Sequence, residues 1–202
     1  MKKLIFVTCA LALASIANAQ LIANFTGGDD LSVGPGTAGY DFTVGSVPLT
    51  VQSLGIWAAD SSGLFSSHEV GIWDMTPQHN LLAEVNITPS AVALNSFLYA
   101  SITPLTLSAN TSYVIAAQYA DSDFDYAKGN VPSVTMSGAR MGDALLSTGS
   151  GFGFPDLDVS GANLGFIGPN AAFLAVPEPA ATSLIAGLCL LLVAVYRRWQ
   201  IT

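Results

Sequence analysis

Apolar and polar residues alternate with a period of two along the central part of the chain. Tyr40, Phe42 and Val44 are separated by polar or small residues, and the stretches 81–88 and 113–119 follow the same pattern. A period of two places successive side chains on opposite faces of a β-strand. No window of eleven or more residues in this part shows a helical stripe, so the sequence predicts strands.

Clusters of turn-forming residues separate these stretches, namely GGDD, GPG, DSSG, TPQHN and SAN. Many short strands with frequent turns favour two antiparallel sheets packed face to face. We therefore predict an all-β fold, an antiparallel, jelly-roll-like β-sandwich. The alternation at 49–52 changes phase before Leu54 and Ile56, which predicts a β-bulge near Ser53-Leu54.

Two further features concern the order of the strands. Leu54-Gly55-Ile56-Trp57 is echoed sixteen residues later by Val70-Gly71-Ile72-Trp73, and we interpret the pair as a hairpin that presents two matching tryptophans. Beyond Tyr119 the alternation weakens in a region rich in glycine and aspartate. We expect loops there, to about residue 163, followed by last strands around 164–167 and 171–176.

The first nineteen residues have the features of a secretory signal. Two lysines precede an apolar stretch, and Ala17-Asn18-Ala19 supplies the small residues that signal peptidase requires. We expect cleavage between Ala19 and Gln20. The two cysteines, Cys9 and Cys189, both lie outside the stretch 20–175, so this stretch must fold without disulfides.

The last 27 residues, 176–202, read as a separate segment. Residues 180–196 carry no charge and make a helix of roughly 26 Å at about 1.5 Å per residue, close to the hydrocarbon thickness of ~30 Å. Arg197 and Arg198 follow, and positive charge beside a span stays in the cytoplasm. The sequence predicts a signal peptide over 1–19, an acidic ectodomain over 20–175, and a tail whose transmembrane helix holds it in the membrane.

This tail resembles the PEP-CTERM sorting signal of Gram-negative bacteria. The resemblance rests on Pro177-Glu178-Pro179, the apolar span and the terminal Arg197-Arg198, in that order and in a chain with a signal peptide. It implies recognition by an exosortase, a membrane-embedded cysteine enzyme, followed by cleavage near the tripeptide and transfer to the cell surface or the extracellular space. Such systems accompany exopolysaccharide production. The alternative is a single-pass anchor that is never cut.

A second resemblance covers about residues 38–119. The stretches GYDFTVGSVPLTVQSLGIW, SSHEVGIWD and LSANTSYVIAAQY are similar to a bacterial domain of unknown function found in secreted and surface proteins. The resemblance implies a β-sandwich and brings no activity with it. Asn110 stands where the pattern has glycine in a turn, and asparagine tolerates the left-handed conformation that such a turn needs.

Charge in the ectodomain is strongly negative. Residues 20–175 contain two basic side chains against thirteen acidic ones, a net charge of −11. Such a surface repels nucleic acid and anionic headgroups, and it favours solubility or cations. We therefore expect no nucleic-acid partner.

Asp121, Asp123 and Asp125 form the candidate metal site. Acids at alternate positions can direct several oxygens toward one Ca²⁺ ion. The loop departs from an EF-hand because Tyr126 and Pro132 stand where glycine and glutamate are needed. A solvated acidic loop without a cofactor is the alternative.

Trp57 and Trp73 are the candidate ligand-binding residues. An exposed indole stacks on a sugar ring, whereas a buried one fills a core. The ectodomain has no cysteine nucleophile and no Gly-x-Ser-x-Gly motif. His68, Asp74 and His79 lack the spacing of a zinc site, and we assign them structural or surface roles.

These patterns predict an exported, non-catalytic cell-surface or extracellular-matrix protein. Signal peptidase, an exosortase-type enzyme and the membrane are its expected partners. The alternative function is a binding module for extracellular polysaccharide. A secreted carbohydrate-active enzyme, which would need two facing carboxylates, is a third possibility.

Overall fold

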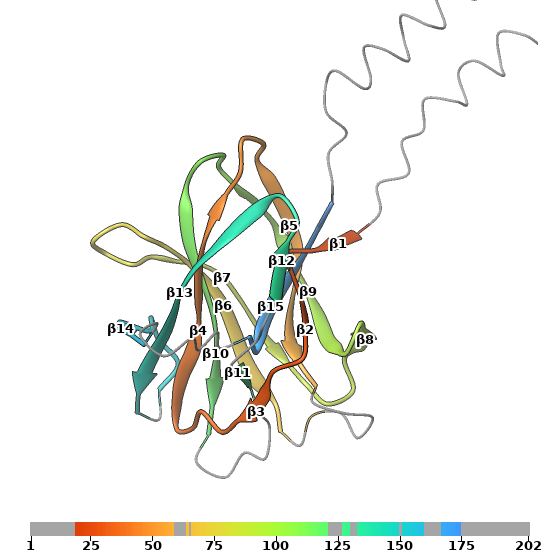
Figure 1. Cartoon of the computed structure of the whole chain (residues 1–202), viewed down its shortest axis with the longest axis vertical. Helices are drawn as coiled ribbons and strands as arrows, with labels where there is room; N and C mark the ends of the chain where they lie inside the picture. Colours follow the sequence, from red (N-terminus) through yellow and green to blue (C-terminus); the bar gives the residue numbers. More distant parts are fainter. Residues whose placement is uncertain are drawn as a thin grey trace, which may run out of the picture. The chain divides into compact units, whose positions relative to one another are not determined.

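Every regular element of the described structure is a β-strand, and every strand pair is antiparallel (Figure 1). The computed structural model describes residues 19–58, 64, 66–120, 127–129, 133–149, 151–159 and 167–174. The all-β antiparallel fold expected from the alternation is therefore confirmed for this part of the chain.

Two larger sheets account for most of the strands. The five-stranded sheet has the order β1-β15-β5-β9-β8, with β1 Ala19–Leu21, β15 Pro169–Leu174, β5 Leu49–Trp57, β9 Phe97–Leu107 and β8 Val92–Leu94. The six-stranded sheet has the order β14-β13-β4-β10-β6-β7, with β14 Leu157–Asp158, β13 Ala139–Thr148, β4 Gly36–Val44, β10 Ser112–Tyr119, β6 His68–Asp74 and β7 Leu81–Ile87.

Two short ribbons complete the described fold. β2 (Ala23–Thr26) pairs with β12 (Ser133–Met136), and β3 (Asp29–Leu31) pairs with β11 (Ala127–Gly129). Both ribbons join a segment near the start of the chain to one from its second half, and they contribute to the candidate site described below.

The larger sheets contact each other through strand pairs such as β7 with β9 and β5 with β6. Tyr40, Phe42, Leu54, Ile56 and Ile115 are among the side chains that are fully buried. β10 is buried continuously from Tyr113 to Ala117, because aromatic residues at 152 and 154 cover Val114 and Ala116 on its second face. The arrangement is consistent with a β-sandwich.

The predicted bulge is confirmed in β5. Burial in this strand passes from Leu49 and Val51 to Leu54 and Ile56. The register against β15 shifts at the same place, since Phe173 faces Val51 and its neighbour Ala172 faces Ser53. Gln52 is thus the extra residue that reverses the phase of the strand.

The loop expectation for residues 120–163 is wrong in part. β13 is ten residues long and lies inside the six-stranded sheet, between β14 and β4. Its register against β4 shifts between Met141 and Ala144. This irregularity at Gly142-Asp143 breaks the alternation, and for that reason the sequence pattern does not reveal the strand.

The expected hairpin of the two tryptophan motifs is also wrong. β5, which ends in Trp57, belongs to the five-stranded sheet, whereas β6, which holds Trp73, pairs with β7 and β10. Both glycines of the motifs are close to aromatic rings, Gly55 to Tyr99 and Gly71 to Phe152. The echo therefore reflects similar packing in two different sheets.

The two ends of the described fold are paired with each other. Ala19 faces Leu174 and Gln20 faces Phe173 in the β1–β15 pair. Within the described residues no helix is long and apolar enough to cross a membrane. The predicted span 180–196, the tripeptide Pro177–Pro179 and the arginines at 197 and 198 lie outside those residues, as does the signal segment up to Asn18.

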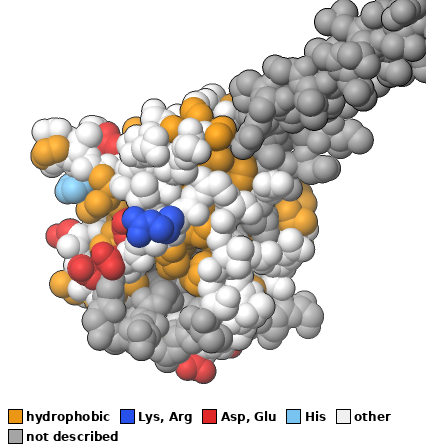
Figure 2. Space-filling model, turned by 45° about the horizontal axis from the view of Figure 1, so that its top comes forward, with side chains coloured by type: hydrophobic (Ala, Val, Ile, Leu, Met, Phe, Trp, Pro, Cys, Tyr) orange, Lys and Arg blue, Asp and Glu red, His pale blue; other side chains and the backbone are white. Residues whose placement is uncertain are grey.

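Charge and apolar surface are unevenly distributed. On the face in Figure 2, acidic side chains lie mostly toward the left, and hydrophobic side chains form several separate patches. Val92, in the edge strand β8, is the most exposed large hydrophobic among the described residues, at 74%. Scattered patches of this kind need no partner to explain them.

Candidate functional site

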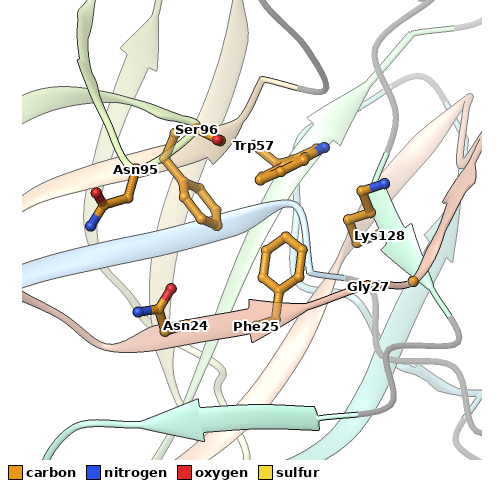
Figure 3. A pocket seen from close by; sticks show the side chains of 9 residues that line it. Asn24, Phe25, Gly27, Trp57, Asn95, Ser96 and Lys128 are labelled. Atoms are coloured by element: carbon orange, nitrogen blue, oxygen red, sulfur yellow. The ribbon is translucent and has the colours of Figure 1, made fainter.

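A pocket of about 300 Å³ opens where β2, the end of β5, the β8–β9 turn and β11 meet (Figure 3). Its lining combines aromatic rings, amides and one lysine, and consists of Asn24, Phe25, Gly27, Gly28, Trp57, Asn95, Ser96, Phe97 and Lys128. Pockets that combine an apolar surface with a few fixed polar groups are the usual form of a small-molecule site.

Three aromatic rings pack edge to face beside this pocket. The Trp57 ring centroid lies 4.8 Å from that of Phe25 and 5.4 Å from that of Phe97. Phe97 is buried, whereas Phe25 and Trp57 remain partly exposed. The Trp57 Nε1 atom is buried and has no hydrogen-bond partner among the described residues. Two partly exposed rings therefore present a rigid apolar surface.

Lys128 lies beside the Trp57 indole, on the side opposite to the Asn24 and Asn95 amides (Figure 3). Its Nζ lies 5.5 Å from the Trp57 ring centroid and 2.7 Å from Asp30 Oδ1. The β3–β11 pairing places these two residues opposite each other. Figure 3 shows Asn24 and Asn95 on one side of the Phe25 and Trp57 rings and Lys128 on the other. The lysine thus holds a carboxylate already and adds little free charge to the pocket.

Asn95 and Ser96 form a two-residue hairpin turn. Leu94 pairs with Phe97 across it, and the two turn residues have φ angles of 51° and 63°. Positive φ at both positions is the type I′ turn, which matches the twist of the flanking strands. The turn directs the Asn95 amide toward the pocket edge, where Asn24 of β2 also lies (Figure 3).

A second pocket of about 540 Å³ adjoins the first and shares Asn24, Phe25 and Asn95 with it. The rest of its lining is mostly hydroxyl-bearing and amide side chains, from Gln20, Thr26, Leu94, Ser133, Thr135 and Ser137. We call the two pockets together the β2 groove. The described residues of the two linings include no carboxylate, although the chain has a net charge of −8.

A buried amide holds β2 in place beneath the groove. Asn170 of β15 donates from Nδ2 to the Ala23 carbonyl at 2.8 Å and accepts from the Ala23 N–H at 3.0 Å. Both residues are fully buried. The Asn170 side chain therefore makes the two backbone hydrogen bonds that a neighbouring strand would make with Ala23. β12 pairs with β2 as well.

The two tryptophans predicted as ligand-binding residues have different surroundings. Trp57 lines the β2 groove. Trp73 is only 3% exposed and packs with Val114 and Ala116 on the far side of the six-stranded sheet, covered by Phe152 and Phe154. Trp73 consequently fills a core and contacts neither pocket.

The predicted calcium ligands Asp121, Asp123 and Asp125 lie outside the described residues. Asp156 and Asp158, two acids later in the chain, belong to the described residues, and both are exposed. Within the described part of the chain, no group of three or more His, Cys, Asp or Glu side chains is placed to hold a metal ion. Ala19 and Gln20, the predicted cleavage site, lie in β1.

Sequence reasoning missed most of the groove. Phe25, Asn24 and Lys128 carry no local signal, because distant pairings bring them to Trp57. The β8–β9 turn does carry a local sequence signal, since Asn95-Ser96 separates the apolar runs VAL and FLY as the loop of a two-residue hairpin does. No protein-family model matches the chain, and no curated protein is similar to it in sequence.

The β6–β7 turn depends on an ionised carboxylate. Asp74 Oδ1 accepts hydrogen bonds from the Thr76 hydroxyl at 2.7 Å and the Asn80 N–H at 2.9 Å, and Oδ2 accepts from the Asn80 amide. The Thr76 and Asn80 side chains are the main cause that lowers the pKa of Asp74 from 3.8 to about 2. His79 of the same turn stacks on Phe154 at 3.8 Å between centroids.

Asp74 makes stability depend on pH below 4. Because folding lowers the pKa of this carboxyl, its stabilisation is complete above about pH 4 and is lost as pH falls toward 2. We expect Tm to decrease more steeply over this range in the natural protein than in Asp74→Asn. The difference in Tm between the two proteins should be constant above pH 5. Parallel Tm curves from pH 6 to pH 2 would contradict the role of Asp74.

Proposed function

We propose that the protein is an exported, non-catalytic cell-surface or extracellular-matrix protein with a jelly-roll-like β-sandwich, sorted by an exosortase-type enzyme. The pairing of Ala19 with Leu174 is the observation that supports this best. The predicted signal-peptidase cut follows Ala19, and Pro177 comes three residues after Leu174. Both processing sites thus flank the same pair of strand ends.

The β1–β15 pair also tolerates the first cut. Removal of residues 1–19 leaves Gln20 opposite Phe173 and Leu21 opposite Ala172. The new N-terminus remains part of the five-stranded sheet, and the cut removes only Ala19 from β1. Pro177 and Pro179 favour an extended segment that cannot join a helix, which suits cleavage near the tripeptide.

Replacement of Pro177, Glu178 and Pro179 by alanine is expected to block removal of the tail. Mass spectrometry of the exported protein from the natural host should give a product that lacks both end segments for the natural sequence. The variant should retain the C-terminal segment and fractionate with membranes. Alanine at Thr88, Pro89 and Ser90, an exposed turn, is the matched control and should be processed normally. If all three proteins lost the same C-terminal residues, the result would contradict the proposal.

The β2 groove favours the second function, a binding module for extracellular polysaccharide. A partly exposed indole held rigidly beside two amides is suited to a sugar, which has an apolar C–H face and polar edges. This role is compatible with a surface or matrix protein, because a matrix protein that holds a glycan stays attached to the cell.

A further inference from the structure

We infer that the β2 groove binds an extended, uncharged glycan chain across at least two sugar residues, an inference that rests on the polysaccharide-binding function proposed above. One sugar would lie against Phe25 and Trp57, and the next would lie between the hydroxyl side chains of β12 and the β8–β9 turn. Asn24 and Asn95 line both pockets and would contact both sugars.

The size and continuity of the groove indicate a chain and not a single small molecule. The two pockets have volumes of about 300 and 540 Å³ and are joined through Asn24, Phe25 and Asn95. Each pocket alone has the volume of a small-molecule site, for which about 300–1,000 Å³ is usual. A ligand that fills both must extend past the shared residues, as a linear oligomer does.

The electrostatics of the groove indicate an uncharged ligand. Among the described residues of both linings, Lys128 is the one charged side chain, and its ammonium group is paired with Asp30. Residues 20–175 have a net charge of −11, which repels a polyanion such as a uronic-acid polymer. A polycation would find no carboxylate among the lining residues that the structure describes. The uncharged hydroxyl groups of a neutral glycan match the amide and hydroxyl side chains of the groove.

The polar groups of the groove match a polyol better than a peptide. A bound extended peptide usually adds a strand to a free sheet edge through main-chain hydrogen bonds. Here one edge of β2 is paired with β12, and on the other edge Asn170 occupies both polar groups of Ala23. The groove instead offers side-chain amides and hydroxyls, which both donate and accept hydrogen bonds. Sugar hydroxyls also donate and accept hydrogen bonds, so they can pair with either kind of group.

Three variants remove ligand contacts while preserving the fold. Asn95→Gly removes the amide and keeps the left-handed backbone, which has φ of 51°. Thr135→Val removes one exposed hydroxyl in β12 without changing the side-chain shape. Trp57→Phe reduces the aromatic area that faces the ligand, and among the described residues no group loses a hydrogen bond to Nε1. Thr106→Val, at an exposed position in β9, is the matched control.

The test is calorimetric titration of the full-length protein in a detergent without a sugar headgroup. The probes are cellohexaose, laminarihexaose and chitohexaose, with a hexamer of mannuronate and an unstructured Gly-Ser peptide as comparison ligands. We expect at least one neutral hexamer to bind, and to bind more tightly than its dimer. Asn95→Gly and Thr135→Val should each weaken binding about three- to tenfold, the loss of one hydrogen bond. Trp57→Phe should weaken it similarly, and Thr106→Val should not.

The outcomes separate this inference from the function on which it rests. If a neutral hexamer binds and all three groove variants bind it equally well, the groove inference is wrong and polysaccharide binding stands at another site. If neither a neutral hexamer nor the mannuronate hexamer binds, both are wrong. Tighter binding of the mannuronate hexamer or of the peptide would also overturn the assignment of an uncharged glycan. Tm values of all variants within about 5 °C of the natural protein show that the fold is intact.

Discussion

Gly39→Val is expected to destabilise the fold by about 3–5 kcal/mol, a large part of the 5–15 kcal/mol that holds a typical domain together. Gly39 lies in β4, between β10 and β13. A Cβ at this position would overlap the Ile115 carbonyl oxygen and lie 2.6 Å from the Ala116 Cα. Both obstacles are backbone atoms of the neighbouring strand, so the clash cannot be relieved by a change of rotamer.

Urea unfolding followed by tryptophan fluorescence measures this effect. Gly151→Ala is the matched control, because a Cβ at that position meets no atom within 4 Å and should change stability by less than about 0.5 kcal/mol. Gly39→Ala should fall between the two, since it adds the clashing Cβ without the two methyl groups. A Gly39→Val midpoint equal to that of Gly151→Ala would show that β4 and β10 can separate without cost.

Local patterns predicted the strands whose alternation is undisturbed. β4, β7 and β10 appear where Tyr40, Val85 and Tyr113 and their neighbours alternate with polar or small residues. The phase change in β5 correctly indicated a bulge, and Asn110 has the left-handed φ of 54° that was expected of a turn residue in place of glycine. In each case the physical cause acts within a few residues, so the sequence displays it.

Features that depend on distant pairing were not predictable in this way. β13 was missed because its bulge at Gly142-Asp143 removes the alternation, and the Trp57 and Trp73 motifs were assigned to one hairpin because an echo does not show which sheet a strand joins. The same limit applies to the candidate site. Trp57 could be singled out as an aromatic residue, but its exposure depends on Phe25 and Lys128, which the β2–β12 and β3–β11 ribbons bring to it.

Asn170→Ala is expected to cost about 2–5 kcal/mol. The substitution removes the partners of the Ala23 N–H and carbonyl, and Ala23 is fully buried, so each group keeps its desolvation cost of about 1–3 kcal/mol without a hydrogen bond. The Ala171 N–H also loses its bond to Asn170 Oδ1. Thermal and urea unfolding measure the total, and Asn86→Ala, at an exposed position in β7, is the control, expected to stay within about 0.5 kcal/mol of the natural protein.

The location of the loss distinguishes this role from general packing. Asn170 holds β2, and β2 carries Asn24 and Phe25 into the groove. In Asn170→Ala, amide hydrogen exchange should therefore accelerate first in β2 and β12, while β4 and β10 retain their protection until global unfolding. The affinity of Asn170→Ala for the neutral hexamers should also fall, because the Asn24 amide and the Phe25 ring would no longer be held in one position. Uniform acceleration across both large sheets would mean that Asn170 supports the whole core and has no special relation to the groove.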